Sequence, residues 1–124
     1  MQLLTLKAVR AAARKYYKAR KLTAQHRSRE KRLCEYKVGS YRCAIGAALT
    51  QETLSRMLVG SGPADVIEIL PHEKDSLNFL QKAHDEWARA SRMLGANDSY
   101  TRKARNEFLE LIGLRKKKKE LEEW

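Results

Sequence analysis

Cys34-Glu-Tyr-Lys-Val-Gly-Ser-Tyr-Arg-Cys43-Ala-Ile-Gly46 is the stretch on which the fold class of this 124-residue chain depends most. Apolar and polar residues alternate on both sides of Gly39-Ser40, and this pattern predicts a β-hairpin with a two-residue type II′ turn. A hairpin alone is only marginally stable, so we expect helices to cover its apolar face. The register places three pairs on that face: Val38 with Tyr41, Tyr36 with Cys43, and Cys34 with Ile45.

Helical periodicity dominates the rest of the chain. A first helix is expected from about Leu3 to Leu22. A second follows an N-cap at Thr50 and ends near Gly60, whereas the short apolar segment 64–70 fits either a helix or a strand. The apolar face of the first helix comprises Leu6, Val9, Ala13, Tyr16 and Tyr17.

Two further helices are predicted towards the C-terminus. One begins at Asp75 or Ser76 and ends near Leu94, with Gly95 as its C-cap. The last begins at Asp98 or Ser99 and is interrupted at Gly113. The apolar positions are Leu77, Leu80, His84, Trp87 and Leu94 on the former, and Ala104, Phe108, Leu111 and Ile112 on the latter. We therefore predict an α+β fold, mostly helical, with one β-hairpin packed against three to five helices.

The chain is expected to form a single domain with three parts. Residues 1–32 are a basic N-terminal helix and loop, residues 33–114 are the core of hairpin and helices, and residues 115–124 are a charged C-terminal extension. This length suffices for a core without a metal or disulfides. No apolar run reaches the roughly 18–20 residues that span a membrane. Two cysteines and no export signal indicate the reducing cytoplasm.

Charge is distributed very unevenly along the chain. Residues 1–42 contain thirteen Lys or Arg and two acids, whereas residues 43–124 contain thirteen of each sign. The basic side of the first helix has no acidic partner at i+3 or i+4, so its cations repel one another. We expect these side chains to face water and to contact phosphates or acidic groups. The candidate binding residues are Lys7, Arg10, Arg14, Lys18 and Lys21 on the helix, and Arg27, Arg29, Lys31 and Arg32 in the loop.

Catalytic and metal-binding alternatives use the two cysteines. Cys34 or Cys43 would be a nucleophile with His84 as base and Asp85 or Asp75 as its orienting group. The hairpin register places both thiols on the apolar face, where burial makes a thiol inert. His84 lies beside Trp87 on an apolar helix face, as core histidines do. The possible zinc set of Cys34, Cys43, His72 and His84 has spacings unlike those of structural zinc sites, so no cofactor or metal is expected.

Parts of the chain resemble a group of small proteins of tailed bacteriophages. The matching features, in order, are the hairpin with Cys43-Ala-Ile-Gly46, then Leu80-Gln-Lys-Ala-His84-Asp85, and then Phe108 before Gly113-Leu114. The resemblance spans residues 33–114. The chain departs from the group in its tighter turn, in Leu49-Thr-Gln-Glu52 and in its basic first 32 residues. The resemblance implies a setting, the cytoplasm of a bacterial host, and no particular activity.

These observations predict a non-enzymatic accessory protein of phage type that binds nucleic acid through phosphates, using residues 7–32. An alternative is an inhibitor that binds the acidic or nucleic-acid-binding surface of a host protein. A Cys/His-dependent enzyme or a zinc-binding protein is the third possibility.

Overall fold

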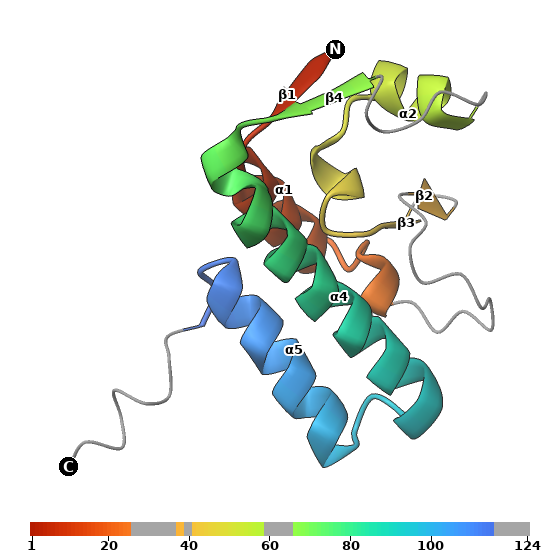
Figure 1. The fold of residues 1–124 in the computed structure, drawn as a ribbon. Helices are drawn as coiled ribbons and strands as arrows, with labels where there is room; N and C mark the ends of the chain where they lie inside the picture. The colour runs from red at the N-terminus through yellow and green to blue at the C-terminus, as the bar shows by residue number, and fades with distance from the viewer. Residues whose placement is uncertain (26–36, 39–40, 59–65, 116–124) are drawn as a thin grey trace.

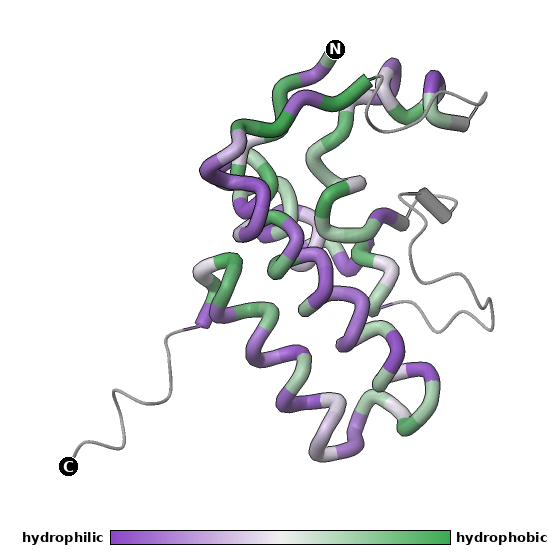
Figure 2. Tube along the Cα trace, in the orientation of Figure 1, coloured by the Kyte–Doolittle hydropathy of each residue, from purple (hydrophilic) through white to green (hydrophobic). Residues whose placement is uncertain are grey.

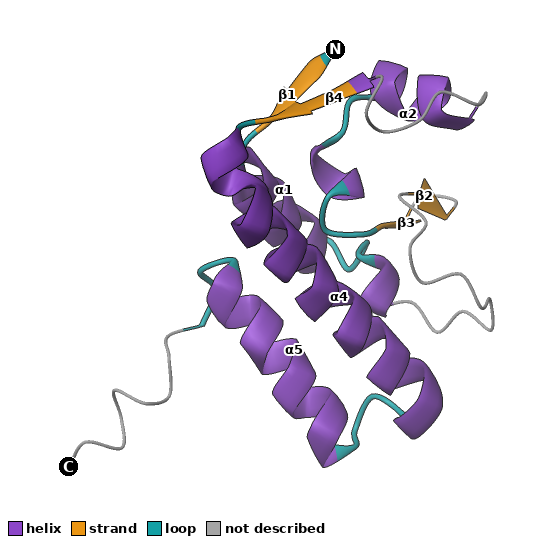
Figure 3. Cartoon of the chain, viewed as in Figure 1, coloured by secondary structure: helices purple, strands orange, loops and turns teal. Residues whose placement is uncertain are grey.

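The computed structural model describes residues 1–25, 37–38, 41–58 and 66–115. Within these ranges the protein is mostly helical, with four α-helices and two sheets of two strands each (Figure 1, Figure 3). The coarse prediction of a mostly helical α+β fold is confirmed. In chain order the elements, with η for 3-10 helices, are β1 (Gln2–Leu4), α1 (Leu6–Lys18), η1 (Thr23–Gln25), β2 (Lys37–Val38), β3 (Tyr41–Arg42), η2 (Gly46–Ala48), α2 (Gln51–Leu58), β4 (Ile67–Ile69), η3 (Pro71–Glu73), α4 (Lys74–Leu94) and α5 (Ser99–Leu111).

Helices α4 and α5 lie side by side as an antiparallel pair, and this contact is the most extensive between any two elements of the described residues (Figure 1). The turn between them was predicted correctly. Gly95 is the C-cap of α4 with φ of 90°, and the Asp98 side chain accepts a hydrogen bond from the Tyr100 N–H at 2.9 Å. Hydrophilic and hydrophobic residues alternate along both helices, as they do in helices with one buried face (Figure 2).

The core lies where α1 and η1 meet the α4–α5 pair. As predicted, Val9 and Ala13 of α1 are buried, and Tyr16 and Tyr17 pack against the core. On α4 the buried stripe ends at Ala90, so the expectation for Leu94 is wrong and its side chain is exposed. The core residues from α4, α5 and the turn after α5 include Leu77, Leu80, His84, Trp87, Ala104, Phe108, Leu109 and Ile112.

The longer sheet was not predicted. Strand β1 pairs in parallel with β4, with Gln2 opposite Ile67 and Leu4 opposite Ile69. The first helix therefore begins at Leu6 rather than Leu3. Thr5 is its N-cap, and the Thr5 hydroxyl accepts a hydrogen bond from the Ala8 N–H at 3.1 Å. A strand of three residues whose partner lies more than sixty positions away leaves no local pattern that would distinguish it from a helix start.

The prediction that a β-hairpin forms the main sheet of the fold is wrong. Strands β2 and β3 are antiparallel with Val38 opposite Tyr41, but each is only two residues long. The Arg42 N–H donates to the Lys21 carbonyl at 2.9 Å, and a turn and η2 follow at once. Cys43 and the next residue, Ala44, are both 0% exposed, whereas a strand places consecutive residues on opposite faces. The expected partners Cys34 and Tyr36 lie outside the described residues.

Helix α2 begins as predicted after Thr50, whose hydroxyl accepts a hydrogen bond from the Thr53 N–H at 3.2 Å. In the short apolar segment that fitted either a helix or a strand, Ile67–Ile69 form the strand β4. Among the described residues, no helix combines the length and apolar character that crossing a membrane requires.

Candidate functional site

Helix α1 ends at Lys18 rather than near Leu22, so Lys21 follows the helix and the expectation that it lies on it is wrong. The structure divides the five expected cations into two groups. Lys7, Lys18 and Lys21 are exposed, whereas Arg10 and Arg14 are partly buried. The expectation that Arg10 and Arg14 face water is therefore wrong.

Both arginines lie at the C-terminal end of α5. Arg14 Nη1 donates a hydrogen bond to the carbonyl oxygen of Ile112 at 2.7 Å. A Cβ atom added at Gly113 would lie 2.9 Å from Arg10 Nη2 and 3.5 Å from Arg14 Nη1, so the two guanidinium groups pack directly against this backbone. The end of a helix carries partial negative charge and unpaired carbonyls, which attract cations. These two arginines consequently stabilise the junction of α1 and α5.

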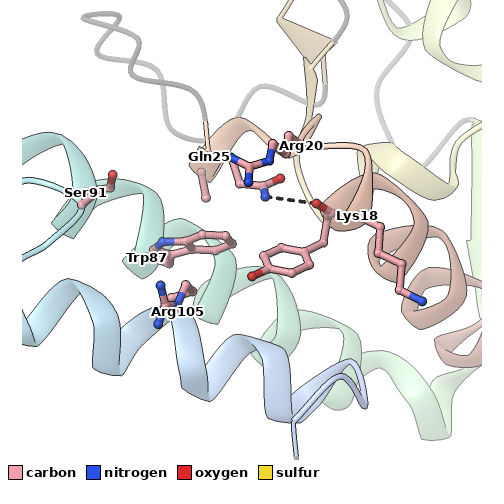
Figure 4. Close-up of a pocket in the computed structure, with 9 residues that line it drawn as sticks. Lys18, Arg20, Gln25, Trp87, Ser91 and Arg105 are labelled. Carbon is pink, nitrogen blue, oxygen red and sulfur yellow. Dashed lines mark hydrogen bonds between the residues drawn. The ribbon is translucent and has the colours of Figure 1, made fainter.

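The exposed end of the stripe borders a pocket of about 540 Å³ (Figure 4). The pocket opens where the end of α1, the turn that follows and η1 face α4 and α5. Among the described residues, its lining combines two aromatic rings with three cations and includes no carboxylate. The lining residues are Tyr17, Lys18, Arg20, Ala24, Gln25, Trp87, Ser91, Ala96 and Arg105.

Arg20 owes its position to the way in which α1 ends. Its φ of 58° is the only positive φ among the non-glycine residues of the described part of the chain. The Arg20 N–H donates to the Tyr17 carbonyl at 3.0 Å, and the Lys21 N–H donates to the Tyr16 carbonyl at 2.9 Å. This is the Schellman arrangement, in which glycine usually occupies the left-handed position. An arginine there strains the backbone and adds a cation to the rim of the pocket.

The Gln25 side chain holds this turn against η1. Its Nε2 donates to the Tyr17 carbonyl at 3.1 Å, which is the dashed line in Figure 4, and its Oε1 accepts from the Leu22 N–H at 3.2 Å. Leu22 is fully buried, so the turn is anchored in the core as well. The rim that carries Arg20 is thus built from a fixed backbone.

Arg105 reaches the pocket from α5 without a carboxylate partner among the described residues. Its Nε and Nη2 both donate to Asn106 Oδ1, at 3.3 and 3.2 Å. A neutral amide orients the guanidinium without cancelling its charge, and it occupies two of the five N–H groups. In the view of Figure 4, Arg20 and Arg105 lie on opposite sides of the Trp87 indole.

The two residues directly before Trp87 on α4 are acids, and both have other partners. Asp85 Oδ1 accepts from Gln81 Nε2 at 2.8 Å and lies 3.2 Å from His84 Nδ1. Glu86 accepts from Arg89 Nε at 3.0 Å. Neither acid contributes to the pocket lining. The cations of the pocket therefore remain available to an anion from solution.

The aromatic part of the pocket is a tilted pair. The ring centroids of Tyr17 and Trp87 are 6.1 Å apart, at 53° to each other. Trp87 is 5% exposed and packs on Phe108 with centroids 5.8 Å apart, so it forms a rigid floor. Tyr17 is only partly buried and presents more of its ring. This arrangement can hold a flat group close to positive charge.

His84 is a core histidine, as its place beside Trp87 predicts. It is 0% exposed, and its Nε2 accepts from the Ala24 N–H at 3.3 Å. This contact assigns the ring proton to Nδ1, which donates to Asp85. Asp85, rather than Asp75, is therefore its carboxylate partner. With both nitrogens occupied, His84 links η1, which lines the pocket, to α4.

Cys43 is also a core residue. Burial raises the pKa of its thiol to about 12. The Gly46 N–H donates to its Sγ at 3.2 Å. A thiol with that pKa supplies almost no nucleophilic thiolate near neutral pH. Cys34, the other proposed nucleophile, lies outside the described residues. The described part of the chain holds no group of three or more His, Cys, Asp or Glu that could bind a metal ion.

The sequence interpretation of the site was incomplete. Of the pocket residues it identified Lys18 as a binding residue, but it missed Arg20, Arg105 and Trp87. One sequence signal could have indicated Arg20: the first helix ends without a glycine, so a basic residue has to occupy the left-handed position of its C-terminal turn. No local pattern distinguishes Arg105 from the other cations on α5. Four of the expected binding residues follow Gln25 in the chain and lie outside the described residues: Arg27, Arg29, Lys31 and Arg32.

Comparison of the chain with protein-family models, with curated proteins and with solved structures found no match. The resemblance to tailed-bacteriophage proteins therefore stays a prediction from the motifs. The pocket has to be interpreted from its own chemistry.

Proposed function

We propose that this protein binds nucleic acid through the phosphate backbone, with the pocket at the end of α1 as the centre of the contact. One observation carries the proposal. Lys18, Arg20 and Arg105 come from a helix, a turn and a second helix, yet they line one pocket to which no carboxylate of the described part of the chain contributes. Phosphate contacts need positioned Lys and Arg side chains and no other chemistry.

The electrostatic arrangement supports a bound polyanion. Three like charges around one pocket repel each other, and one of them stands on a left-handed backbone that an arginine adopts at a cost. A phosphate bound among them would relieve the repulsion. Lys21, which follows Arg20 directly in the chain, is exposed and adds a further positive charge.

The proposed surface differs from the row of α1 cations expected from sequence. Arg10 and Arg14 occupy the end of α5, so the row is interrupted in its middle. Lys7 lies eleven residues before Lys18, about 16 Å along the helix, and is a peripheral contact at most. We propose that Arg27, Arg29, Lys31 and Arg32, which follow Gln25 in sequence and lie outside the described residues, also contact phosphate. The phage resemblance suggests an accessory protein that acts in bacterial cytoplasm.

The test is binding to a single strand and to a duplex over a salt series. Counterion release predicts a fall of log K with log salt, with a slope of about −0.7 per neutralised phosphate on a single strand and −0.9 on a duplex. The Arg105→Ala variant should bind more weakly and lose about one such unit of slope. Arg102→Ala is the matched control, because Arg102 is an exposed arginine on the same helix outside this pocket.

Competition with polyglutamate of matched charge tests the alternative function, an inhibitor that binds an acidic host protein. If polyglutamate competes as well as nucleic acid, the acidic-protein alternative replaces the proposal. The absence of salt-dependent binding to any nucleic acid at low salt would also overturn it.

A further inference from the structure

We propose that the pocket takes one unstacked nucleotide of a single strand, with its base against the Tyr17 ring beside Trp87 and the phosphates that flank this base near Arg20 and Arg105. This inference rests on the proposed function and narrows it from nucleic acid in general to single-stranded segments.

The shape of the pocket favours an unpaired base over a duplex. A purely electrostatic contact would need only cations on a flat surface, but here the cations line a hollow of about 540 Å³ together with two aromatic rings. That volume falls within the range of about 300–1,000 Å³ that is typical of sites for small molecules. Bases inside a duplex are stacked on each other and show only their edges in the grooves. Only an unpaired base can place its flat face against Tyr17.

The position of the cations around the aromatic rings matches the base and the phosphates of a nucleotide. Arg20 and Arg105 lie on opposite sides of the Trp87 indole in the view of Figure 4, and Lys18 follows Tyr17 directly in the chain. A nucleotide joins a flat apolar face to an anion only a few bonds away. Single-strand-binding proteins use the same combination of aromatic faces and a positively charged groove.

The polar groups of the pocket indicate little preference among bases. Gln25 is already engaged with the turn, through the Tyr17 carbonyl and the Leu22 N–H. Ser91 and Tyr17 carry hydroxyls, and a hydroxyl both donates and accepts hydrogen bonds, so it fits any base edge. We therefore expect binding that tolerates most sequences.

Electrostatics alone predicts the opposite preference, which makes the inference testable. A duplex carries one charge per about 1.7 Å of axis, so a purely electrostatic surface binds a duplex at least as well as a single strand. A preference for the single strand must then come from contact with the base.

The experiment uses the full chain carrying Trp124→Phe, which leaves Trp87 as the single tryptophan reporter. Its fluorescence is titrated with an oligothymidylate of about ten nucleotides, an abasic strand of the same length, a duplex of the same length, and thymidine monophosphate. We expect the oligothymidylate to bind about fivefold or more tightly than the abasic strand, which has the same charge but no bases. We also expect it to bind more tightly than the duplex and the mononucleotide.

Two tyrosine variants form a matched pair. Tyr17 and Tyr16 are neighbours that both pack partly against the core, but only Tyr17 lines the pocket. Tyr17→Leu should abolish the preference for bases over the abasic strand and keep the salt-dependent binding, whereas Tyr16→Leu should keep both. If Tyr17→Leu does not fold, the comparison of thymidylate with the abasic strand on the parent chain still decides the question.

The outcomes separate this inference from the proposed function. Equal affinity for the abasic and thymidylate strands, or tighter binding of the duplex, overturns the inference and leaves phosphate binding intact. If thymidine monophosphate binds as tightly as the strand, the inference of a single-strand site is wrong and the pocket is a site for free nucleotides. Loss of all salt-dependent binding overturns the proposed function itself.

Discussion

Arg14 Nη1 donates a hydrogen bond to the carbonyl oxygen of Ile112 at 2.7 Å, and thereby ties the first long helix to the end of the last one across 98 positions of sequence. This contact gives a structural role to an arginine that the sequence alone assigns to a binding surface. The partly buried guanidinium satisfies a carbonyl at the end of α5, where the helix dipole also favours positive charge.

Replacement of this arginine should destabilise the fold. Arg14→Met keeps much of the apolar stem but removes the charged hydrogen bond, and we expect the free energy of unfolding to fall by about 1–2 kcal/mol. Urea denaturation followed by circular dichroism measures the change. Lys7→Met is the control, since Lys7 is exposed on the same helix and should change stability by less than about 0.5 kcal/mol. Equal effects of the two variants would contradict the capping role.

At Arg20 stability and binding should change in opposite directions. Arg20→Gly removes the left-handed strain at φ of 58°, and we expect a gain in stability of about 0.5–1 kcal/mol together with weaker nucleic-acid binding. Arg20→Ala removes the same charge but keeps a Cβ atom in the strained conformation, so it should weaken binding without the gain. Denaturation and strand titration on both variants measure the two effects. Unchanged affinity in both would remove Arg20 from the site.

His84 should matter for stability and, through η1, for the pocket. His84→Phe keeps an aromatic ring in the core but leaves the Ala24 N–H and Asp85 without the histidine. We expect the free energy of unfolding to fall by about 2–3 kcal/mol, because a buried donor loses its partner. Thermal or urea unfolding tests this directly. A stability equal to that of the parent chain would show that these hydrogen bonds contribute nothing net.

The thiol of Cys43 should be unreactive in the folded protein. Because burial raises its pKa to about 12, alkylation at pH 8 should occur only after unfolding. The test uses Cys34→Ser, so that Cys43 is the single thiol, and follows iodoacetamide labelling by mass with and without urea. Rapid labelling in buffer alone would contradict the buried position.

The same raised pKa predicts how stability depends on pH. The unfolded thiol loses its proton near pH 9.0 and the folded one only near 12, so the folded state binds more protons between these values. The contribution of Cys43 to stability is therefore complete below pH 9 and is lost as pH rises from there towards 12. Cys43→Ala should reduce this fall relative to Cys34→Ser. Parallel pH dependences in the two variants would exclude the thiol as its source.

Local patterns accounted for much of the helical structure. The caps at Thr50 and Asp98, the C-cap at Gly95 and the buried face of α4 from Leu77 to Trp87 all depend on residues within a few positions of each other. The hairpin prediction used equally local evidence, but the alternation after Arg42 belongs to a buried turn in which Cys43 and Ala44 are both inaccessible. Alternation over a few residues does not distinguish a strand from a turn that is buried on all sides.

The amino-acid sequence by itself determined where the long helices run, which of their faces are apolar, and that the excess positive charge lies in the first third of the chain. These properties follow from covalent order and from interactions that span one or two helical turns. Only the tertiary structure decided that β1 pairs with β4, that Arg10 and Arg14 pack at the end of α5, and that Arg20 lines one pocket with Trp87 and Arg105. Each of these relationships joins segments more than sixty residues apart, and no periodicity or motif records which distant surfaces meet when the core closes.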